Sequence, residues 1–166
     1  MASKSSSALD KTKITHEKRV CTQTPEETAI LASHFSQQLE PGDVVAFFGD
    51  LGTGKTFFIQ GICRALGCRE YVTSPTFTIL QEYRTASGIP IYHFDFYRLS
   101  HPAELVNLGL DDFFYGQGIS MIEWADKILE ELPIPRWEIH IYFVEGQSNA
   151  RQIQIRRVEQ KHEESG

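Results

Sequence analysis

The chain has 166 residues, of which 41% are hydrophobic, 11% aromatic and 23% charged, and its formal net charge is −6. These values are typical of a globular protein, and the length predicts one domain with a continuous core. No stretch approaches the roughly 20 apolar residues of a membrane-spanning helix. The polar N-terminus lacks the apolar segment of a secretory signal. The sequence therefore predicts a cytoplasmic protein that does not contact a membrane.

The three cysteines and the distribution of charge exclude further classes. Cys21, Cys63 and Cys68 cannot all pair with one another and form no C-x-x-C motif, so neither a disulfide framework nor a cysteine zinc site is predicted. Residues 1–19 are basic and serine-rich, whereas residues 20–150 are strongly acidic. An acidic body is a poor surface for nucleic acid, because phosphate binding needs clustered lysine and arginine.

In chain order, the first 19 residues are predicted to be a disordered polar tail, with a short strand beginning at Arg19. Thr24, Pro25 and Glu27 have the spacing of a helix N-terminus with a capping box, and the helix is predicted to end before Pro41. Residues 44–48 are continuously apolar, which is typical of a strand buried on both faces. A glycine-rich loop follows, and a second helix is predicted from Lys55 to residue 66.

The remainder of the chain alternates between strands and short helices. Strands are predicted at residues 78–83, 89–94, 119–122, 138–144 and 152–156, and short helices at residues 102–107, 110–115 and 126–132. The first two of these strands are close enough to form an antiparallel hairpin. The domain is predicted to span residues 20–157, followed by a polar tail at 158–166.

Residues 49–56 read Gly-Asp-Leu-Gly-Thr-Gly-Lys-Thr and match the phosphate-binding pattern G-x-x-x-x-G-K-[ST] at every fixed position. Glycines let backbone N–H groups face a phosphate, and the following helix adds the positive end of its dipole. Lys55 is then placed to bridge phosphate oxygens, and Thr56 to offer its hydroxyl to Mg²⁺. With its flanking strand and helix, the motif predicts an α/β fold of the P-loop NTPase type. Such a fold has three layers: a mixed, mostly parallel sheet with helices on both faces, here with an antiparallel C-terminal extension.

Two carboxylates end apolar strands, at the edge of the sheet where ligands of α/β proteins collect. They are Asp95 and Glu123. Either one could hold the metal, directly or through water, and one could instead orient an attacking water. The alternative is that they are surface carboxylates.

Residues 72–77 form a second polar loop, which is either a sensor of the γ-phosphate or a plain turn. His93 and Tyr97 flank Asp95. A packed or hydrogen-bonded core histidine is the favoured interpretation of His93. Trp124 either packs over the site or caps the core.

Taken together, these motifs resemble the bacterial tRNA threonylcarbamoyladenosine biosynthesis ATPase family, TsaE. The resemblance covers roughly residues 20–157. It rests on the P-loop at 49–56, S-P-T-F at 74–77, I-Y-H-F-D-F-Y-R-L at 91–99, H-P-A-E-L and G-L-D-D-F-F within 101–114, and I-E-W at 122–124.

The resemblance implies a small ATPase that helps to form threonylcarbamoyladenosine at position 37 of tRNAs that read ANN codons. It implies that the chain acts with the TsaD–TsaB pair and meets tRNA only through these partners. ATP and Mg²⁺ are the implied cofactors. Lys55, Asp95 and Glu123 are the implied catalytic residues, and Thr56 and Glu123 the metal ligands. The implied nucleotide-binding residues are Gln23, Glu27, Leu51, Gly52, Thr53, Gly54, Lys55, Thr56, Thr76, Asp95 and Trp124.

Within that set, Gln23 and Glu27 are expected on the adenine side, and Thr76 belongs to the switch-like loop. A contact near residues 146–147 is a looser expectation. Two other functions remain open: a small-molecule or nucleotide kinase, and a nucleotide-binding module that does not hydrolyse. A kinase normally has an arginine-rich lid, whereas the arginines of this chain are scattered. No arginine lies in the P-loop or in S-P-T-F, so a slow ATPase that its partners stimulate is expected.

Overall fold

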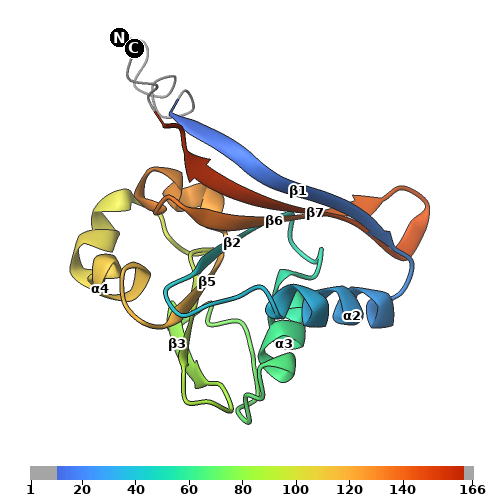
Figure 1. The fold of residues 1–166 in the computed structure, drawn as a ribbon, viewed down its shortest axis with the longest axis horizontal. Helices are drawn as coiled ribbons and strands as arrows, with labels where there is room; N and C mark the ends of the chain where they lie inside the picture. Colours follow the sequence, from blue (N-terminus) through green and yellow to red (C-terminus); the bar gives the residue numbers. More distant parts are fainter. Residues whose placement is uncertain (1–10, 163–166) are drawn as a thin grey trace.

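The computed structural model describes residues 11–162, and within that part of the chain a seven-stranded mixed sheet forms the central layer (Figure 1). The strand order is β1-β7-β6-β2-β5-β4-β3. The strands are β1 (Thr12–Thr22), β2 (Val44–Phe48), β3 (Leu80–Arg84), β4 (Pro90–Asp95), β5 (Ile119–Glu123), β6 (Arg136–Val144) and β7 (Gln147–Gln160).

The middle of the sheet is parallel and its two edges are antiparallel. Strands β6, β2, β5 and β4 run parallel to one another, β3 pairs antiparallel with β4, and β7 and β1 extend the other edge antiparallel to β6. Four of the five residues of β2 are buried, as expected for a parallel strand covered on both faces. The predicted mixed α/β sheet with an antiparallel extension is confirmed.

Helices cover both faces of the sheet (Figure 1). On one face, α2 (Pro25–Ser36) and α3 (Lys55–Ala65) bury Phe35 and Phe58 against Phe47 of β2. The other face is covered by α4 (Leu110–Phe114) and the 3₁₀ helices η1 (Pro102–Leu108) and η2 (Ala125–Glu131). There, Phe114 and Ile128 join a second cluster of buried apolar side chains. No helix among residues 11–162 is long and apolar enough to cross a membrane.

The start of α2 has the predicted capping. The Thr24 hydroxyl accepts a hydrogen bond from the Glu27 amide at 3.2 Å, and the Glu27 carboxylate accepts one from the Gln23 amide at 2.7 Å. The first contact satisfies one of the N–H groups that a helix N-terminus leaves free, and the second ties Gln23, the residue before the N-cap, to the first turn of the helix. The helix ends at Ser36, one turn earlier than the apolar spacing indicates.

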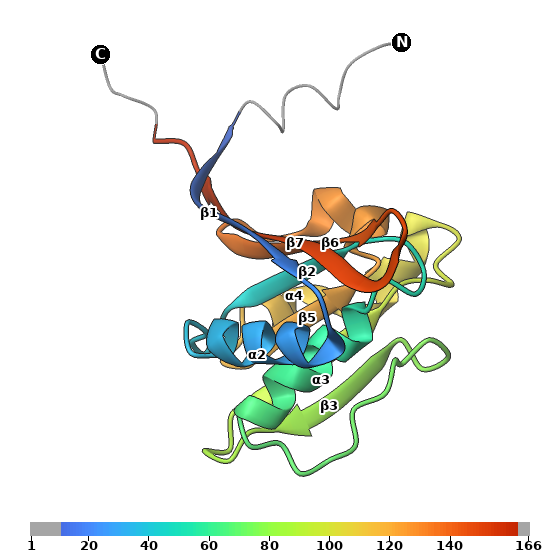
Figure 2. The ribbon, with the colours of Figure 1, turned by 90° about the vertical axis from the view of Figure 1, so that its right-hand side faces the viewer.

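The predicted boundaries of the tails are wrong for the described residues. Residues 12–19 were predicted as tail but belong to β1, which pairs with β7 from Thr12↔Gln160 to Thr22↔Arg151. The two strands run side by side in both views (Figures 1 and 2). Most of β1 is exposed, so few of its side chains need to be apolar and its sequence shows no apolar alternation. Backbone hydrogen bonds to β7 hold the strand in place. For the same reason β7 continues past residue 157 to Gln160. Residues 1–10 and 163–166 of the predicted tails lie outside the described residues.

Candidate nucleotide-binding site

The glycine-rich loop connects the buried strand β2 to the N-terminus of α3. Gly54 is the N-cap residue of α3, with φ = 108°, and no side chain caps this helix end. The first N–H groups of α3 are therefore directed at the loop rather than at a capping side chain, which is the arrangement that binds anions.

Close packing around the loop explains its first glycine. A Cβ atom on Gly49 would lie 2.6 Å from the Ile141 carbonyl oxygen of β6. A larger residue would therefore push the loop away from the sheet. On the outer side, the Arg151 guanidinium of β7 donates a hydrogen bond to the Thr53 carbonyl at 2.8 Å. The antiparallel extension of the sheet thus fixes the loop from its outer side, a role for Arg151 that no local sequence pattern predicted.

Lys55 is the buried cation of the site. Its ammonium donates hydrogen bonds to the carbonyl oxygens of Gly49 at 2.5 Å and Asp50 at 3.1 Å, and it lies 4.2 Å from the centroid of the Trp124 ring. Burial lowers the pKa of Lys55, while the nearby carboxylates, Glu123 first, act in the opposite direction. An ammonium with so little water around it gains more from a phosphate than an exposed one does.

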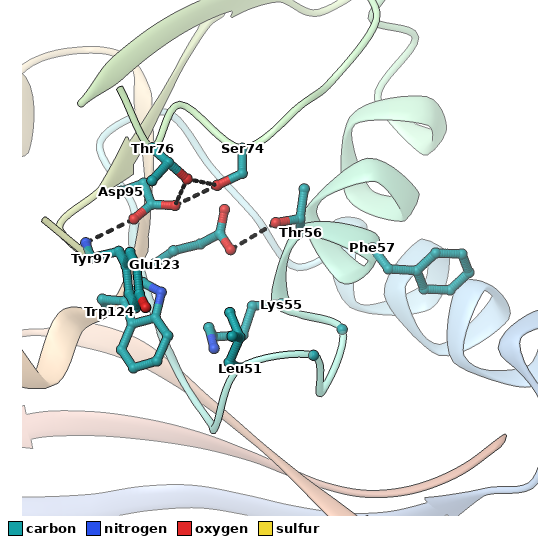
Figure 3. Close-up of a pocket in the computed structure, with 12 residues that line it drawn as sticks. Leu51, Lys55, Thr56, Phe57, Ser74, Thr76, Asp95, Tyr97, Glu123 and Trp124 are labelled. Atoms are coloured by element: carbon teal, nitrogen blue, oxygen red, sulfur yellow. Dashed lines mark hydrogen bonds between the residues drawn. The ribbon is translucent and has the colours of Figure 1, made fainter. Parts of the chain in front are cut away.

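The sheet register brings the two predicted carboxylates together. Asp95 and Glu123 are paired residues at the ends of the parallel strands β4 and β5. Glu123 accepts a hydrogen bond from the Thr56 hydroxyl at 2.8 Å, which Figure 3 shows as a dashed line between the two elements. The carboxylate of a strand and the hydroxyl at the start of α3 therefore face the same space.

A buried histidine holds the other oxygen of Glu123. His93 Nε2 lies 2.6 Å from Glu123 Oε2, and His93 Nδ1 lies 3.2 Å from the Tyr83 hydroxyl. That hydroxyl also donates to the Thr73 carbonyl at 3.1 Å. The interpretation of His93 as a hydrogen-bonded core residue is confirmed, and its partner is the site carboxylate itself.

Asp95 connects the site to the loop of residues 72–77. Its Oδ2 accepts hydrogen bonds from the hydroxyls of Ser74 and Thr76, the second at 3.3 Å, and its Oδ1 accepts one from the Tyr97 amide at 2.8 Å. The hydroxyl side chains of S-P-T-F thus face the sheet edge rather than solvent (Figure 3). This loop is tied to a site carboxylate, unlike a plain surface turn.

A cleft of about 350 Å³ unites these groups. It is lined by Leu51, Gly52, Gly54, Lys55, Thr56, Phe57, Ser74, Thr76, Asp95, Tyr97, Glu123 and Trp124. A neighbouring pocket of about 230 Å³ shares Gly54 and Phe57 with it and is also lined by Pro25, Thr28, Thr53, Asn149 and Arg151. The Phe57 ring points away from the cleft in Figure 3.

Comparison with known proteins identifies the family. Residues 22–153 match the family model described as "Threonylcarbamoyl adenosine biosynthesis protein TsaE". The chain belongs to the TsaE family. The match includes every residue of the cleft, so the expected membership is confirmed over the whole candidate site.

Individual relatives agree with this result. The chain is 46% identical to the tRNA threonylcarbamoyladenosine biosynthesis protein TsaE of Bacillus subtilis over 120 residues, which cover 72% of this chain and 74% of that protein. It is 38% identical to the protein of the same name from Rickettsia conorii over 141 residues, covering 84% and 79%. A crystal structure of Bacillus subtilis YdiB superposes with a TM-score of 0.73 at 37% identity and covers 87% of each chain.

The structure of this TsaE chain gathers most of the residues that its sequence singled out. Nine of them line the cleft: Leu51, Gly52, Gly54, Lys55, Thr56, Thr76, Asp95, Glu123 and Trp124. Thr53 lines the neighbouring pocket, with its hydroxyl bonded to the Asp50 carbonyl at 2.9 Å. Gln23 and Glu27 are in neither set. They cap α2, whose first turn contributes Pro25 and Thr28 to the neighbouring pocket.

Three residues of the cleft were not among the predicted nucleotide-binding residues. Ser74 and Tyr97 lie within S-P-T-F and beside Asp95, so their position in the motifs already signalled them. Phe57 carries no such signal, because an apolar residue in the first turn of a helix normally indicates core. The looser expectation at residues 146–147 falls where the turn after β6 meets β7: Gly146 is in the turn with φ = 73°, and Gln147 is the first residue of β7.

Proposed function

We propose that this TsaE-family protein binds ATP and Mg²⁺ in the cleft and hydrolyses the ATP in support of threonylcarbamoyladenosine formation on tRNA. The observation that carries the proposal is the convergence of Lys55, Thr56 and Glu123. A buried ammonium, a hydroxyl at a helix N-terminus and a strand-end carboxylate meet at one cleft. This combination is the phosphate and metal arrangement of P-loop NTPases.

The donor set fits magnesium. The Thr56 hydroxyl and the Glu123 carboxylate are hard oxygen donors 2.8 Å apart, with Asp95 on the adjacent strand. Among residues 11–162, no three His, Cys, Asp or Glu residues form a metal cluster. A small number of protein ligands is enough for Mg²⁺, because the ion keeps several of its waters and is also bound by the nucleotide phosphates. Thr56 and Glu123 would hold the ion, and when bound it neutralises phosphate charge.

The residues of the chain itself have separable tasks in this proposal. Lys55 and the first N–H groups of α3 neutralise the phosphates. Asp95 has most of its acceptor capacity engaged by Ser74, Thr76 and the Tyr97 amide. It is therefore suited to transmit the state of the nucleotide to residues 72–77.

The neighbouring pocket is suited to the nucleoside. It shares Gly54 and Phe57 with the phosphate cleft and is bounded by the first turn of α2, so a nucleotide could extend from one into the other. The Phe57 ring offers an apolar surface for a base. In this arrangement Gln23 and Glu27 act through the position of α2 rather than by lining the phosphate cleft.

The names of the relatives support a role within tRNA modification, and the acidic body of the chain favours a role that does not require direct tRNA binding. We place the chain in the cytoplasm, as the ATPase subunit that acts with the TsaD–TsaB pair. The tRNA would then be held by the partners.

A reconstituted modification assay tests this function. Purified TsaD–TsaB, tRNA, ATP and an activated donor of the threonylcarbamoyl group are combined with and without the chain, and modified adenosine and released phosphate are both measured. We expect modification to require the chain, and phosphate release to be slow for the chain alone and faster with the pair. Phosphate transfer only to an added small-molecule acceptor would identify a kinase instead. Binding of ATP without phosphate release, even with the pair present, would identify a non-hydrolysing module.

A further inference from the structure

Two cysteines, Cys63 and Cys68, lie at the C-terminal end of α3, and the P-loop is at the opposite end of this helix. The Cys68 amide donates to the Cys63 carbonyl at 3.0 Å, and the Gly67 amide donates to the Arg64 carbonyl at 3.1 Å. Gly67 has φ = 78°. These features define a Schellman motif, in which the side chains at the two ends of the turn characteristically touch. Cys63 and Cys68 occupy those two positions.

The two thiols lie on one pocket, and they are not equivalent. The Cys63 thiol is buried, while Cys68 is half-buried. The interaction between the two side chains, more than burial, raises the pKa of Cys63, and the same interaction lowers the pKa of Cys68. Both cysteines line a surface pocket of about 320 Å³. A small oxidant can therefore reach the pair, and Cys68 is the sulfur that favours the reactive thiolate.

We propose that Cys63 and Cys68 are a thiol pair that a hydroperoxide converts to a reversible disulfide. The Cys68 thiolate attacks one peroxide oxygen, the O–O bond breaks, and the leaving hydroxide takes a proton to become water. Cys68 is then a sulfenic acid. Cys63 loses its proton and attacks the Cys68 sulfur, the S–O bond breaks, and the second hydroxide leaves as water. Two thiols and one hydrogen peroxide thus give one disulfide and two waters, and a thiol reductant reverses the change.

The backbone of the turn brings the two residues together. The 3.0 Å hydrogen bond from the Cys68 amide to the Cys63 carbonyl joins them directly. Disulfides need such neighbours, because they span only about 4.4–6.8 Å between Cα atoms. The turn therefore favours this pair over any bond with Cys21.

Cys21 provides a contrast within the same molecule. It is exposed on β1, and its sulfur accepts a hydrogen bond from the Gln23 side-chain amide at 3.5 Å rather than from a thiol. Cys21 has no second cysteine beside it. Its oxidation would therefore give a sulfenic acid or a disulfide with another molecule.

The sequence suits a direct mass-spectrometric test, because Arg64 lies between the two cysteines. The full chain is reduced, freed of reductant, treated with hydrogen peroxide while folded, alkylated and digested with trypsin. We expect peptides 56–64 and 65–69 to appear as one disulfide-linked species, with loss of both alkylated peptides and recovery after dithiothreitol. The Cys21 peptide, residues 20–55, should be absent from this species.

Variants decide between the outcomes. The linked species should persist in Cys21→Ser and be lost completely in Cys68→Ser and in Cys63→Ser. In Cys63→Ser, Cys68 should instead be trapped by dimedone as a sulfenic acid. Circular dichroism confirms folding before oxidation, and Cys68→Ser, at a half-buried position, serves if the buried Cys63→Ser fails to fold. A peroxide dose that oxidises Cys21 in the wild-type chain, but yields no linked 56–64/65–69 species from the folded wild-type chain or from the folded Cys21→Ser variant, would overturn the proposal.

Discussion

At the level of single residues, the charge of Lys55 disfavours its burial in the folded chain but favours the binding of phosphate. Its side chain is 5% exposed, and burial disfavours its charge. Two loop carbonyls and the Trp124 ring satisfy the ammonium in part. A phosphate would supply the full negative charge that these neutral partners lack, so the cost of burying Lys55 would be recovered on binding.

Glu123 is expected to matter more for hydrolysis than for binding. In Glu123→Gln the side chain keeps its size but loses the charge that would anchor Mg²⁺, while Lys55 and the α3 amides remain to hold phosphate. We expect phosphate release with TsaD–TsaB to fall by at least about 10²-fold, whereas the Kd for ATP changes less than about 10-fold. Glu130→Gln, at an exposed position, is the control. Normal hydrolysis by Glu123→Gln would show that another group anchors the metal.

Tyr83 is expected to act on stability through the buried His93. Tyr83→Phe removes the hydroxyl that contacts His93 Nδ1 and donates to the Thr73 carbonyl, and it leaves the buried nitrogen without this partner. The free energy of unfolding should fall by about 1–3 kcal/mol, measured by urea denaturation. Tyr92→Phe is the matched control on the neighbouring strand, because no hydrogen bond is found for its hydroxyl among the described residues. An equal loss in both variants would contradict a stabilising role for the hydrogen bonds of the Tyr83 hydroxyl.

Single-residue patterns predicted the components of the site better than their connections. The P-loop match identified Lys55 and Thr56 because the chemistry of phosphate binding restricts residue type at fixed spacing. The bond between His93 and Glu123 could not be predicted, because it joins two strands through a register that only the folded sheet establishes. Arg151 was missed for the same reason: its contact with Thr53 spans almost 100 residues of sequence.

At the level of elements, the antiparallel pair β6–β7 contains a buried cluster of charges. Glu138 is 5% exposed and is bonded to Arg136 at 2.9 Å, to Arg156 at 2.9 Å and to His140 at 3.0 Å. Burial by itself raises the pKa of Glu138, but these hydrogen bonds and positive charges outweigh it and lower the pKa to about 2. The cluster joins the two strands that bring Arg151 to the P-loop.

This cluster predicts how stability depends on pH. The Glu138 pKa is lower in the folded chain than the ordinary value of 4.5, so its contribution is complete above pH 4.5 and is lost as the pH falls toward 2. The shift corresponds to about 3 kcal/mol. We expect the difference in unfolding free energy between the wild-type chain and Glu138→Gln to shrink by about this amount between pH 6 and pH 2. A difference that stays constant with pH would contradict the prediction.

Elements with strong local signals were predicted well, and β1 was not. The capping box of α2, the apolar run of β2 and the hairpin of β3 and β4 are each encoded within a few residues. Strand β1 is polar, and pairing with β7 at the opposite end of the chain holds it in place. Local patterns cannot indicate a strand whose stability comes from a distant partner.

At the level of the whole molecule, the parallel core of the sheet explains why the site lies where it does. Strands β2, β4 and β5 all end at the same edge, which brings the P-loop, Asp95 and Glu123 to one cleft from three distant parts of the sequence. Two further strands support the same edge: the parallel strand β6 through Ile141, and the antiparallel strand β7 through Arg151. Strands β2, β4 and β5 thus supply the residues of the site, and the neighbouring strands β6 and β7 fix the position of the loop.

Calorimetric titration of ATP and Mg²⁺ into the chain tests the central claim most directly. The wild-type chain and Lys18→Ala, which changes an exposed lysine on β1, should bind one ATP with the same Kd. Lys55→Ala should bind ATP about 10- to 100-fold more weakly than the wild-type chain. It loses charge-assisted hydrogen bonds to phosphate that are worth about 1.5–3 kcal/mol. Equal affinity of Lys55→Ala and the wild-type chain, with both folded, would contradict the assignment of this cleft as the nucleotide site.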